Sequence, residues 1–250
     1  MITKAKIKDI QSLRHKKYRE ETGLFVAEGP KVVGELLQAN IFEVQEIFAL
    51  SEWAEQQKHL YGNDVQLKIQ QINTTELEKI SSLTTPHDVV AVFAQKQEQP
   101  LRHTETGITL ILDDIKDPGN LGTLIRTAHW FGVDQIVCSE GTADQYNSKV
   151  VQSTMASLGK LPLYYVSDLE SWLLEGREKP LLAAALGGIS VMECGSMDHV
   201  ELIIGNESTG IRASLLQMAD KQITIPRVGD AESLNAAVAG AIILYQLRNK

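Results

Sequence analysis

The stretch ITLILDDIKDPGNLGTLIRTAHWF, residues 108–131, decides the fold class of this chain. Its first eight residues are an apolar run that predicts a buried strand, KDPGN predicts a turn, and LGTLIRTAHWF predicts a helix that stops at Gly132. Asn120 has a residue type that caps helix N-termini. A buried strand that turns directly into a helix is the building unit of parallel α/β sheets.

The same order recurs toward the C-terminus. Strands are predicted at DQIVCSE (134–140), VELIIGN (200–206) and KQITIP (221–226), and the last two run into Gly- or Ser-bearing loops followed by helices. The last helix is expected from about residue 233 to 247, with one apolar face formed by Leu234, Val238, Ala241 and Tyr245. Residues 108–250 should therefore form one α/β domain with a largely parallel sheet.

The first 97 residues read as a second, smaller α/β unit. Strands are predicted at 23–29, 44–50 and 89–95, a helix begins at Pro30 and ends at Asn40, and a polar helix lies near 51–60. Residues 98–107 are polar, contain Pro100 and lack apolar periodicity, which is typical of a linker between domains. We expect no internal repeat.

The composition excludes several classes of protein. The chain has 250 residues, 43% of them hydrophobic, and no apolar run of the length that a membrane span needs. Its first residues are too charged for a signal peptide, so we expect a cytoplasmic protein. Cys138 and Cys194 lack the spacing of a zinc site or of a disulfide framework, and we interpret both as buried thiols. No metal is expected.

The charge is unevenly distributed. The net charge of -8 counts against a nucleic-acid partner, because proteins that neutralise phosphates usually show a basic surface. The first twenty residues nevertheless carry seven basic side chains against Asp9 and Glu20. These basic residues are Lys4, Lys6, Lys8, Arg14, Lys16, Lys17 and Arg19. They indicate either a basic surface for RNA or a solvated helix face.

Loops at the carboxyl ends of three predicted strands are candidates for chemistry. They are DIKDPGNLGTLIR (114–126), IIGNESTGI (203–211) and IPRVGDAESLNAA (225–237). Ligands gather beyond this edge of parallel sheets, where glycines let backbone N–H groups approach closely. The loops contain neither a P-loop nor a dinucleotide fingerprint, and Ser208 lacks the surroundings of a hydrolase nucleophile. We interpret His129 as a helix residue, and His87 and His103 as loop residues.

In order and spacing, the three loops resemble the three motifs of the SpoU/TrmH family of SPOUT methyltransferases. The positions that match are Asn120, Gly122 and Arg126, then Gly205, Glu207 and Gly210, then Ile225, Pro226, Ser233, Leu234 and Asn235. Residues 14–33 and 84–93 resemble the start and end of a substrate-binding domain often fused to this family. At the latter, His87 and Asp88 stand where relatives often carry Gln-Gly.

The resemblance implies a fold and an activity. Residues 1–97 would form an L30e-like α/β RNA-binding domain, and residues 108–250 a SPOUT α/β methyltransferase domain with a deep trefoil knot. The chain would transfer a methyl group from S-adenosylmethionine to a ribose 2'-OH of RNA, with 23S ribosomal RNA favoured over tRNA. The resemblance also implies a homodimer that completes its active site across the interface.

The resemblance further implies roles for individual residues. The cofactor would be held by the glycines and apolar side chains of the second and third motifs, namely Gly205, Gly210, Ile225, Pro226 and Leu234. Arg126 would hold an RNA phosphate beside the 2'-OH, because a guanidinium binds phosphate oxygens in pairs. The other catalytic candidates are Asn120, Glu207, Ser233 and Asn235.

Structural roles remain open for several of these residues. Glu207 could shape the cofactor loop or pair with Arg126, and we favour loop shaping. Asn120 could cap its helix, position Arg126 or contact substrate, and Ser233 and Asn235 could be plain N-caps. Two other functions are alternatives: an RNA-binding protein that keeps the fold without catalysis, and a nucleotide-dependent metabolic enzyme. The intact motifs disfavour the first, and the missing dinucleotide fingerprint disfavours the second.

Overall fold

The computed structural model describes residues 1–57, 63–66, 68–97 and 100–249. The chain divides into two compact units. The first consists of Met1–Gln97 together with Asp144–Ala156, and the second of Glu98–Ala143 together with Ser157–Lys250. No helix in the described part of the chain is long and apolar enough to cross a membrane.

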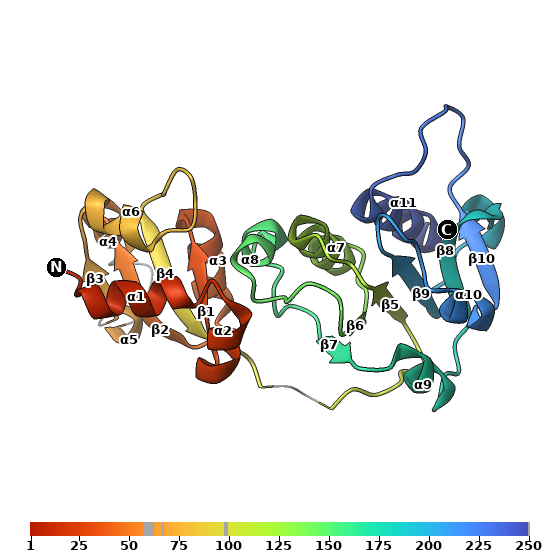
Figure 1. Cartoon of the computed structure of the whole chain (residues 1–250), viewed down its shortest axis with the longest axis horizontal. Coiled ribbons are helices and arrows are strands. Elements are labelled where there is room, and N and C mark those ends of the chain that lie inside the picture. Colours follow the sequence, from red (N-terminus) through yellow and green to blue (C-terminus); the bar gives the residue numbers. More distant parts are fainter. Residues whose placement is uncertain (58–62, 67, 98–99, 250) are drawn as a thin grey trace. The chain divides into compact units, whose positions relative to one another are not determined.

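The first unit is a mixed four-stranded sheet with helices around it (Figure 1). The strand order is β1-β4-β2-β3, in which β4 runs antiparallel to both neighbours and β2 and β3 are parallel. Its strands are β1 (Leu24–Glu28), β2 (Val44–Ala49), β3 (Ile69–Gln71) and β4 (Val89–Ala94). Its helices are α1 (Lys4–Ser12), α2 (Lys16–Thr22), α3 (Pro30–Ala39), α4 (Ser51–Gln57), α5 (Asn63–Gln66), α6 (Thr74–Ile80) and α8 (Ser148–Thr154).

The second unit is built on a six-stranded sheet of order β10-β8-β9-β5-β6-β7, and all of its pairings are parallel. Its strands are β5 (Ile108–Asp113), β6 (Gln135–Ser139), β7 (Leu163–Val166), β8 (Leu181–Ser190), β9 (Val200–Gly205) and β10 (Lys221–Thr224). Its helices are α7 (Pro118–Trp130), α9 (Leu169–Leu174), the short 3-10 helix η1 (Val191–Cys194), α10 (Ala213–Met218) and α11 (Ala236–Arg248). Figure 1 shows the chain between β10 and α11 as a long projecting loop.

Strands β5 and β6 form part of the core of the second unit. Every residue of β5 is buried, and so is every residue of β6, as expected for central strands covered on both faces. Helix α7 packs beside α11, and Gly240 of α11 makes this approach possible, since a Cβ there would lie 2.7 Å from a methyl carbon of Leu124. The helix that carries the first motif and the helix that follows the third are therefore neighbours.

The predicted α/β class is confirmed, and so are the predicted strands and the helix that starts at Pro30 and is capped by Asn40. Two boundaries were wrong. The last helix begins at Ala236 rather than near 233. Helix α7 begins at Pro118, with Asp117 as its N-cap, so Asn120 lies inside the helix. Helix α4 begins at Ser51 as predicted, but its predicted end near residue 60 lies outside the described residues, as do two residues of the linker.

Candidate active site

Two neighbouring strands bring the first two motifs together. Strands β5 and β9 pair in parallel with Asp113 opposite Gly205, so the loops that follow them leave the sheet at the same level. The third motif follows β10, which lies at the sheet edge beside β8. The carboxyl ends of parallel strands share one edge, where ligand sites of α/β sheets lie.

A chain of hydrogen bonds connects the three motifs. The side-chain amide of Asn235 donates to Oδ1 of Asn120 over 2.8 Å, and the amide of Asn120 donates to Oε1 of Glu207 over 2.5 Å. These residues are separated by 115 and 87 positions in the sequence. The hydrogen bond to Glu207 has an ionisable acceptor, a kind that is shorter and stronger than a neutral one. The chain of contacts fixes the orientation of both amides.

Each asparagine is held by its helix. Asp117 caps α7 by accepting the backbone N–H of Asn120 over 2.9 Å, which leaves the Asn120 side chain free for the contacts above. Asn235 is the N-cap of α11, and its Oδ1 accepts from the N–H groups of Ala237 (2.9 Å) and Val238 (3.3 Å). The N-cap interpretation of Asn235 is therefore confirmed, and the same side chain also contacts the first motif.

Asn206, which the sequence analysis missed, shapes the loop after β9. Its Oδ1 accepts from the N–H groups of Ser208 (2.8 Å) and Thr209 (3.1 Å), and its amide donates to the carbonyl of Asp114 (2.8 Å). Loop shaping had been assigned to Glu207, whose carboxylate instead accepts from Asn120. Asn is a common residue in such turns, because its side chain can bond to backbone groups two or three residues ahead. That signal could have identified Asn206.

The two glycines of the second motif are required by backbone geometry. A Cβ at Gly205 would lie 2.4 Å from the backbone nitrogen of Ile211 and 2.5 Å from the carbonyl carbon of Gly210, distances that no side chain tolerates. Gly210 has a φ of 71°, in the left-handed region that favours glycine. Backbone hydrogen bonds between Asn206 and Gly210 in both directions close the loop.

A cavity of about 810 Å³ lies against these loops. It is lined by the second motif from Gly205 to Gly210, by the third motif from Ile225 to Leu234, and by apolar residues of β8 and α11. This volume is typical of sites for drug-sized ligands and cofactors. All five residues predicted to bind the cofactor line it: Gly205, Gly210, Ile225, Pro226 and Leu234.

The residues predicted to be catalytic are only partly brought together. Asn120, Glu207 and Asn235 form the chain of contacts described above, and Glu207 and Ser233 also line the cavity. Arg126 is exposed on α7 and makes no hydrogen bond or ion pair with any residue that the structure describes. An exposed guanidinium remains available to an anion. The alternative in which Glu207 pairs with Arg126 does not occur, since the partner of Glu207 is Asn120.

An ion pair between the buried Asp113 and the exposed Arg212 connects two of the loops and was also missed. Asp113, at the end of β5, accepts from Nε of Arg212 over 2.8 Å and from its backbone N–H over 2.9 Å. Arg212 also lies 3.2 Å from Glu170. Arg212 is the N-cap residue of α10, so the pair fixes the start of that helix against the end of the strand. Its two partners are 99 and 42 residues away, beyond the reach of local patterns.

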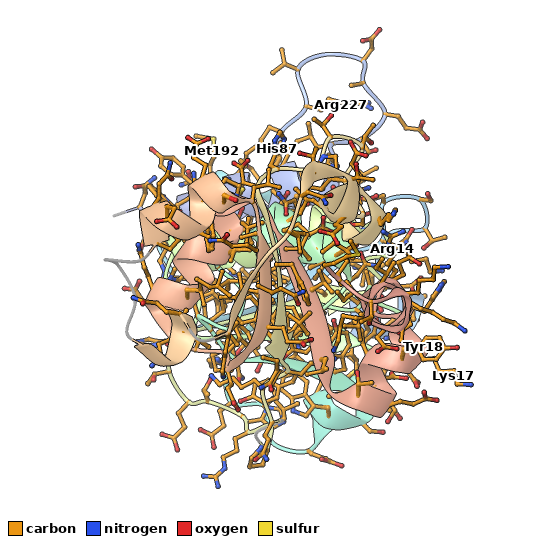
Figure 2. The ribbon with its side chains drawn as sticks, turned by 90° about the vertical axis from the view of Figure 1, so that its left-hand side faces the viewer. Arg14, Lys17, Tyr18, His87, Met192 and Arg227 are labelled. Atoms are coloured by element: carbon orange, nitrogen blue, oxygen red, sulfur yellow. The ribbon has the colours of Figure 1, made fainter. Side chains whose placement is uncertain are left out.

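The basic residues near the N-terminus are more neutralised than their sequence suggests. Arg19 is buried and pairs with Asp144, and Arg14 donates to the carbonyl of Ser81 over 2.6 Å. Ion pairs also form between Lys6 and Glu46, Lys16 and Glu20, and Lys17 and Glu21. Lys17 and Tyr18 nevertheless point outward from α2 (Figure 2). The basic RNA surface is therefore smaller than predicted.

Cys138, Cys194, His103 and His129 do not line the cavity. Cys138 is fully buried, and burial raises the pKa of its thiol, whereas Cys194 is only half-buried, contrary to expectation. His129 lies on the exposed side of α7, with Nδ1 3.2 Å from the Ser157 hydroxyl. His103 was predicted to be a loop residue, and it stacks on the ring of Trp172 with centroids 4.4 Å apart. No group of three or more potential metal ligands occurs within the described residues.

The family models of known proteins match both units of the chain. Residues 107–245 match the model of the SpoU rRNA Methylase family, and residues 4–91 match that of the MRM3-like substrate binding domain. The chain belongs to the SpoU rRNA methylase family. A relative within it is the 23S rRNA (guanosine(2553)-2'-O)-methyltransferase RlmP of Bacillus subtilis (strain 168), 34% identical over 97% of this chain and 96% of its own.

Solved structures of SpoU and TrmH proteins resemble the whole chain. One is a putative RNA methyltransferase of the TrmH family from Porphyromonas gingivalis, with a TM-score of 0.86, 31% identity and coverage of 99% of this chain and 98% of its own. Another is an AdoMet-bound rRNA methyltransferase from Sinorhizobium meliloti, with a TM-score of 0.82, 29% identity and coverage of 99% and 95%. The SpoU fold predicted from the three motifs is thus confirmed, while the trefoil knot stays a prediction.

Proposed function

We propose that this chain transfers a methyl group from S-adenosylmethionine to a ribose 2'-OH of ribosomal RNA. The observation that carries the proposal is the hydrogen-bonded contact of Asn120, Glu207 and Asn235, which joins all three SpoU motifs at one side of the cavity. A protein that had kept the fold without the chemistry would have no need of this polar chain. The relatives whose names state ribose methylation support the same activity.

The residues around the cavity fit the proposed cofactor. Because Gly205 lacks a Cβ, the backbone of Gly210 and Ile211 packs directly against it, and backbone N–H and C=O groups of this loop can approach a ligand in the cavity. Ile225 and Leu234 offer apolar surface to the adenine ring, and polar residues of the loop after β9 also line the cavity. When bound, the cofactor supplies a methyl carbon activated by its sulfonium. Neither role calls for a metal ion.

The remaining work of the protein is alignment and proton removal. We propose that Arg126 binds a phosphate of the RNA and so holds the 2'-OH in line with the methyl carbon, since a guanidinium contacts two oxygens at once. A guanidinium is too weak an acid to act as a free base near neutral pH. The 2'-OH proton would therefore pass to water or to the RNA phosphate. The polar chain from Asn235 to Glu207 would hold the loops that flank the ribose.

The substrate-binding unit favours a ribosomal RNA substrate. Residues 4–91 match a substrate-binding domain model, and RlmP of Bacillus subtilis is named for 23S rRNA. We propose 23S rRNA as the target, with a domain of residues 1–97 that recognises RNA and a catalytic domain from residue 108 onward. We also propose that the enzyme is cytoplasmic, which a 23S ribosomal RNA substrate supports.

We also propose that the enzyme is a homodimer. Large apolar side chains are exposed on the two adjacent helices: Trp130 of α7 is 83% exposed, and Val238, Ile242 and Tyr245 of α11 are 48%, 38% and 57% exposed. A second copy of the chain could bury this surface in a symmetric interface. Light scattering at micromolar concentration should give twice 27.6 kDa. A monomer would contradict a site shared between subunits.

The activity is tested with purified protein, methyl-labelled S-adenosylmethionine and a transcript of 23S ribosomal RNA. We expect the label in a nucleoside that carries a 2'-O-methyl group after complete nuclease digestion, and undiminished transfer in excess EDTA. A tRNA fraction serves as the alternative substrate. Label in a base, or none in either RNA, would contradict the proposal.

A further inference from the structure

The connection between β6 and β7 leaves the second unit and returns to it. Strand β6 ends at Ser139 and β7 begins at Leu163, and both belong to the catalytic sheet. Residues Asp144–Ala156 between them, which include α8, pack into the substrate-binding unit. We call residues 144–156 the coupling segment. Besides the linker near residue 98, the chain thus passes between the units twice more.

A buried ion pair fixes the start of the coupling segment within the first unit. Arg19 is 2% exposed, its Nε donates to Oδ2 of Asp144 over 2.9 Å, and its terminal nitrogens contact the same carboxylate and the carbonyl of Leu13. Tyr146 adds a second attachment, because its hydroxyl accepts the N–H of Lys96 over 3.1 Å and its ring centroid lies 4.9 Å from that of Phe25. Loss of one partner from such a buried pair is strongly destabilising.

The residue before the coupling segment is bonded to the approach to α7. The N–H of Ala143 donates to the carbonyl of Ile115 over 2.8 Å, and the carbonyl of Ala143 accepts the hydroxyl of Tyr165 over 2.7 Å. Ile115 lies two residues before Asp117, the N-cap of α7. Ala143 and Asp144 are consecutive residues. The contact of Ala143 with Ile115, just before α7, is therefore one peptide bond away from the ion pair of Asp144 with Arg19.

The residue after the coupling segment is bonded to the other end of α7. The hydroxyl of Ser157 lies 3.2 Å from Nδ1 of His129, in the last turn of that helix. The two residues before it, Met155 and Ala156, have φ angles of 46° and 61°. Consecutive left-handed conformations are costly for residues with a Cβ and persist where the surroundings enforce them. The path of the chain at this return is therefore closely constrained.

We infer that the coupling segment constrains α7 through the contacts at the two ends of the segment, and that Arg19 and Asp144, which hold the segment, are positioning residues for methyl transfer. Helix α7 carries Asn120 and Arg126. Ile115, just before this helix, is bonded to Ala143, and His129 in its last turn is bonded to Ser157. A shift of about 1 Å at a reacting group can cost about 100-fold in rate, so the placement of this helix matters to catalysis. The catalytic part of this inference rests on the proposed function, whereas the mechanical coupling does not.

Amide hydrogen exchange tests the coupling without any RNA. Asp144→Asn removes the charge that holds Arg19, in the full chain and with little change in side-chain volume. We expect exchange in α7 to accelerate by at least about 5-fold, although α7 belongs to the other unit. Lys6→Gln, which breaks a half-exposed ion pair with Glu46 in the first unit, is the control and should leave α7 unchanged. Faster exchange confined to the first unit would overturn the inference.

Single-turnover kinetics test the catalytic part. With saturating 23S transcript, Asp144→Asn should transfer the methyl group at least about 10-fold more slowly, while the affinities for the transcript and for S-adenosylhomocysteine stay within about 3-fold. Arg19→Lys keeps the positive charge but loses the planar guanidinium group. Its methyl-transfer rate should therefore lie between those of wild type and Asp144→Asn. A normal rate at saturation with weakened RNA binding would show a merely structural role. If wild type transfers no methyl group, the proposed function fails, and the exchange experiment still decides the coupling.

A second variant changes Met155 and Ala156, where the chain returns to the second unit, and leaves the ion pair of Arg19 and Asp144 intact. Replacing Met155 and Ala156 together with glycine preserves the left-handed backbone and relieves its strain, so the protein should fold. The added backbone freedom at residues 155 and 156 should accelerate amide exchange in α7. It should also lower the rate of methyl transfer at saturating RNA at least about 3-fold, with unchanged affinities for the transcript and for S-adenosylhomocysteine. A double variant with wild-type rate and wild-type exchange in α7 would contradict the inference.

Discussion

At the scale of single residues, Asn235 combines two functions in one side chain. Its Oδ1 caps α11 by accepting two backbone N–H groups, and its amide nitrogen donates to Asn120. An aspartate at this position would keep the cap, because Asp and Asn are about equal as N-caps. It would lose the donor and place a second carboxylate near Glu207.

Asn235→Asp therefore separates the two functions. We expect thermal stability close to that of wild type and methyl transfer reduced by at least about 10-fold, since the polar chain between the motifs is broken. Asn235→Ala should in addition lose about 1 kcal/mol of stability through the missing cap. Unimpaired transfer by a stable Asn235→Asp protein would show that only the cap matters.

Arg126 is predicted to act on the RNA and not on the cofactor. Arg126→Ala should lower methyl transfer by at least about 100-fold, the scale expected when one preorganised charged group is removed. Affinity for S-adenosylhomocysteine, measured by calorimetry, should change little. Arg126→Lys should rescue poorly, because an ammonium group lacks the planar fork. Arg102→Ala, at another exposed arginine, should be near wild type, and near-normal turnover of Arg126→Ala would refute this role.

Sequence reasoning identified the residue types of the site but not their contacts. Both Asp117 and Asn120 suit an N-cap, and propensity alone cannot decide between positions three residues apart. The structure assigns the cap to Asp117 and leaves Asn120 for the polar chain. The contact of Asn206 with Asp114, 92 residues away, could not be predicted, although its bonds to Ser208 and Thr209 are local. Such pairings are decided by the packing of the sheet.

At the scale of elements, the loop after β9 depends on Gly205. Gly205→Val would place side-chain carbon against the backbone of Gly210 and Ile211, so the loop cannot keep its shape. We expect loss of detectable S-adenosylhomocysteine binding in calorimetry, while amide exchange shows that the first unit remains folded. Binding of wild-type strength would mean that this loop does not hold the cofactor.

The opposite edge of the same sheet contains a buried charged group. Glu201, near the start of β9, is 1% exposed, and Lys179 beside the start of β8 is 3% exposed. Lys179 donates to the hydroxyls of Thr104 and Thr109, both over 2.9 Å. Burial raises the pKa of Glu201 to about 6, with Lys179 and Arg177 opposing the rise and Asp220 adding to it. The ring of His103 lies 3.9 Å away.

This shift predicts how stability varies with pH. The pKa of Glu201 is raised above its ordinary value of 4.5. The contribution of its neutral carboxyl group to the free energy of unfolding is therefore complete below pH 4.5 and is lost as the pH rises through about 6. Relative to wild type, Glu201→Gln should therefore gain up to about 2 kcal/mol in unfolding free energy between about pH 4 and pH 7.5. Urea unfolding measures this difference, with the exposed Glu193→Gln as control. If the difference in unfolding free energy between Glu201→Gln and wild type did not change across that pH range, the raised pKa of Glu201 would be refuted.

The elements themselves were largely predictable, because apolar periodicity and turn residues are local signals. Four strands of the catalytic sheet, β5, β6, β9 and β10, were predicted from runs such as VELIIGN, and their parallel direction followed from the alternation with helices. Strands β7 and β8 were missed. The end of the last loop was misplaced, since Ser233 and Asn235 both suit an N-cap and the structure uses the second. The role of His103 depended on Trp172, 69 residues away, and left no local signal.

At the scale of the whole molecule, the sequence suggested one boundary between two units, near residue 98. The structure adds residues 144–156 to the first unit. Nothing in NSKVVQST distinguishes a helix of one unit from a helix of the other, because its apolar face suits either core. The decisive interaction is that of Arg19 with Asp144, which also removes one cation from the predicted basic surface. Ion pairs between residues so far apart in the sequence cannot be predicted by counting charges along the chain.

The measurement that most directly tests the central claim is a map of ribose methylation in total RNA. It would compare a strain that lacks this protein with its parent, and with the same strain supplied with wild type or Arg126→Ala. Ribose methylation at one position of 23S ribosomal RNA should disappear in the deletion strain, return with wild type and stay absent with Arg126→Ala. Identical maps for the parent and the deletion strain would contradict the account.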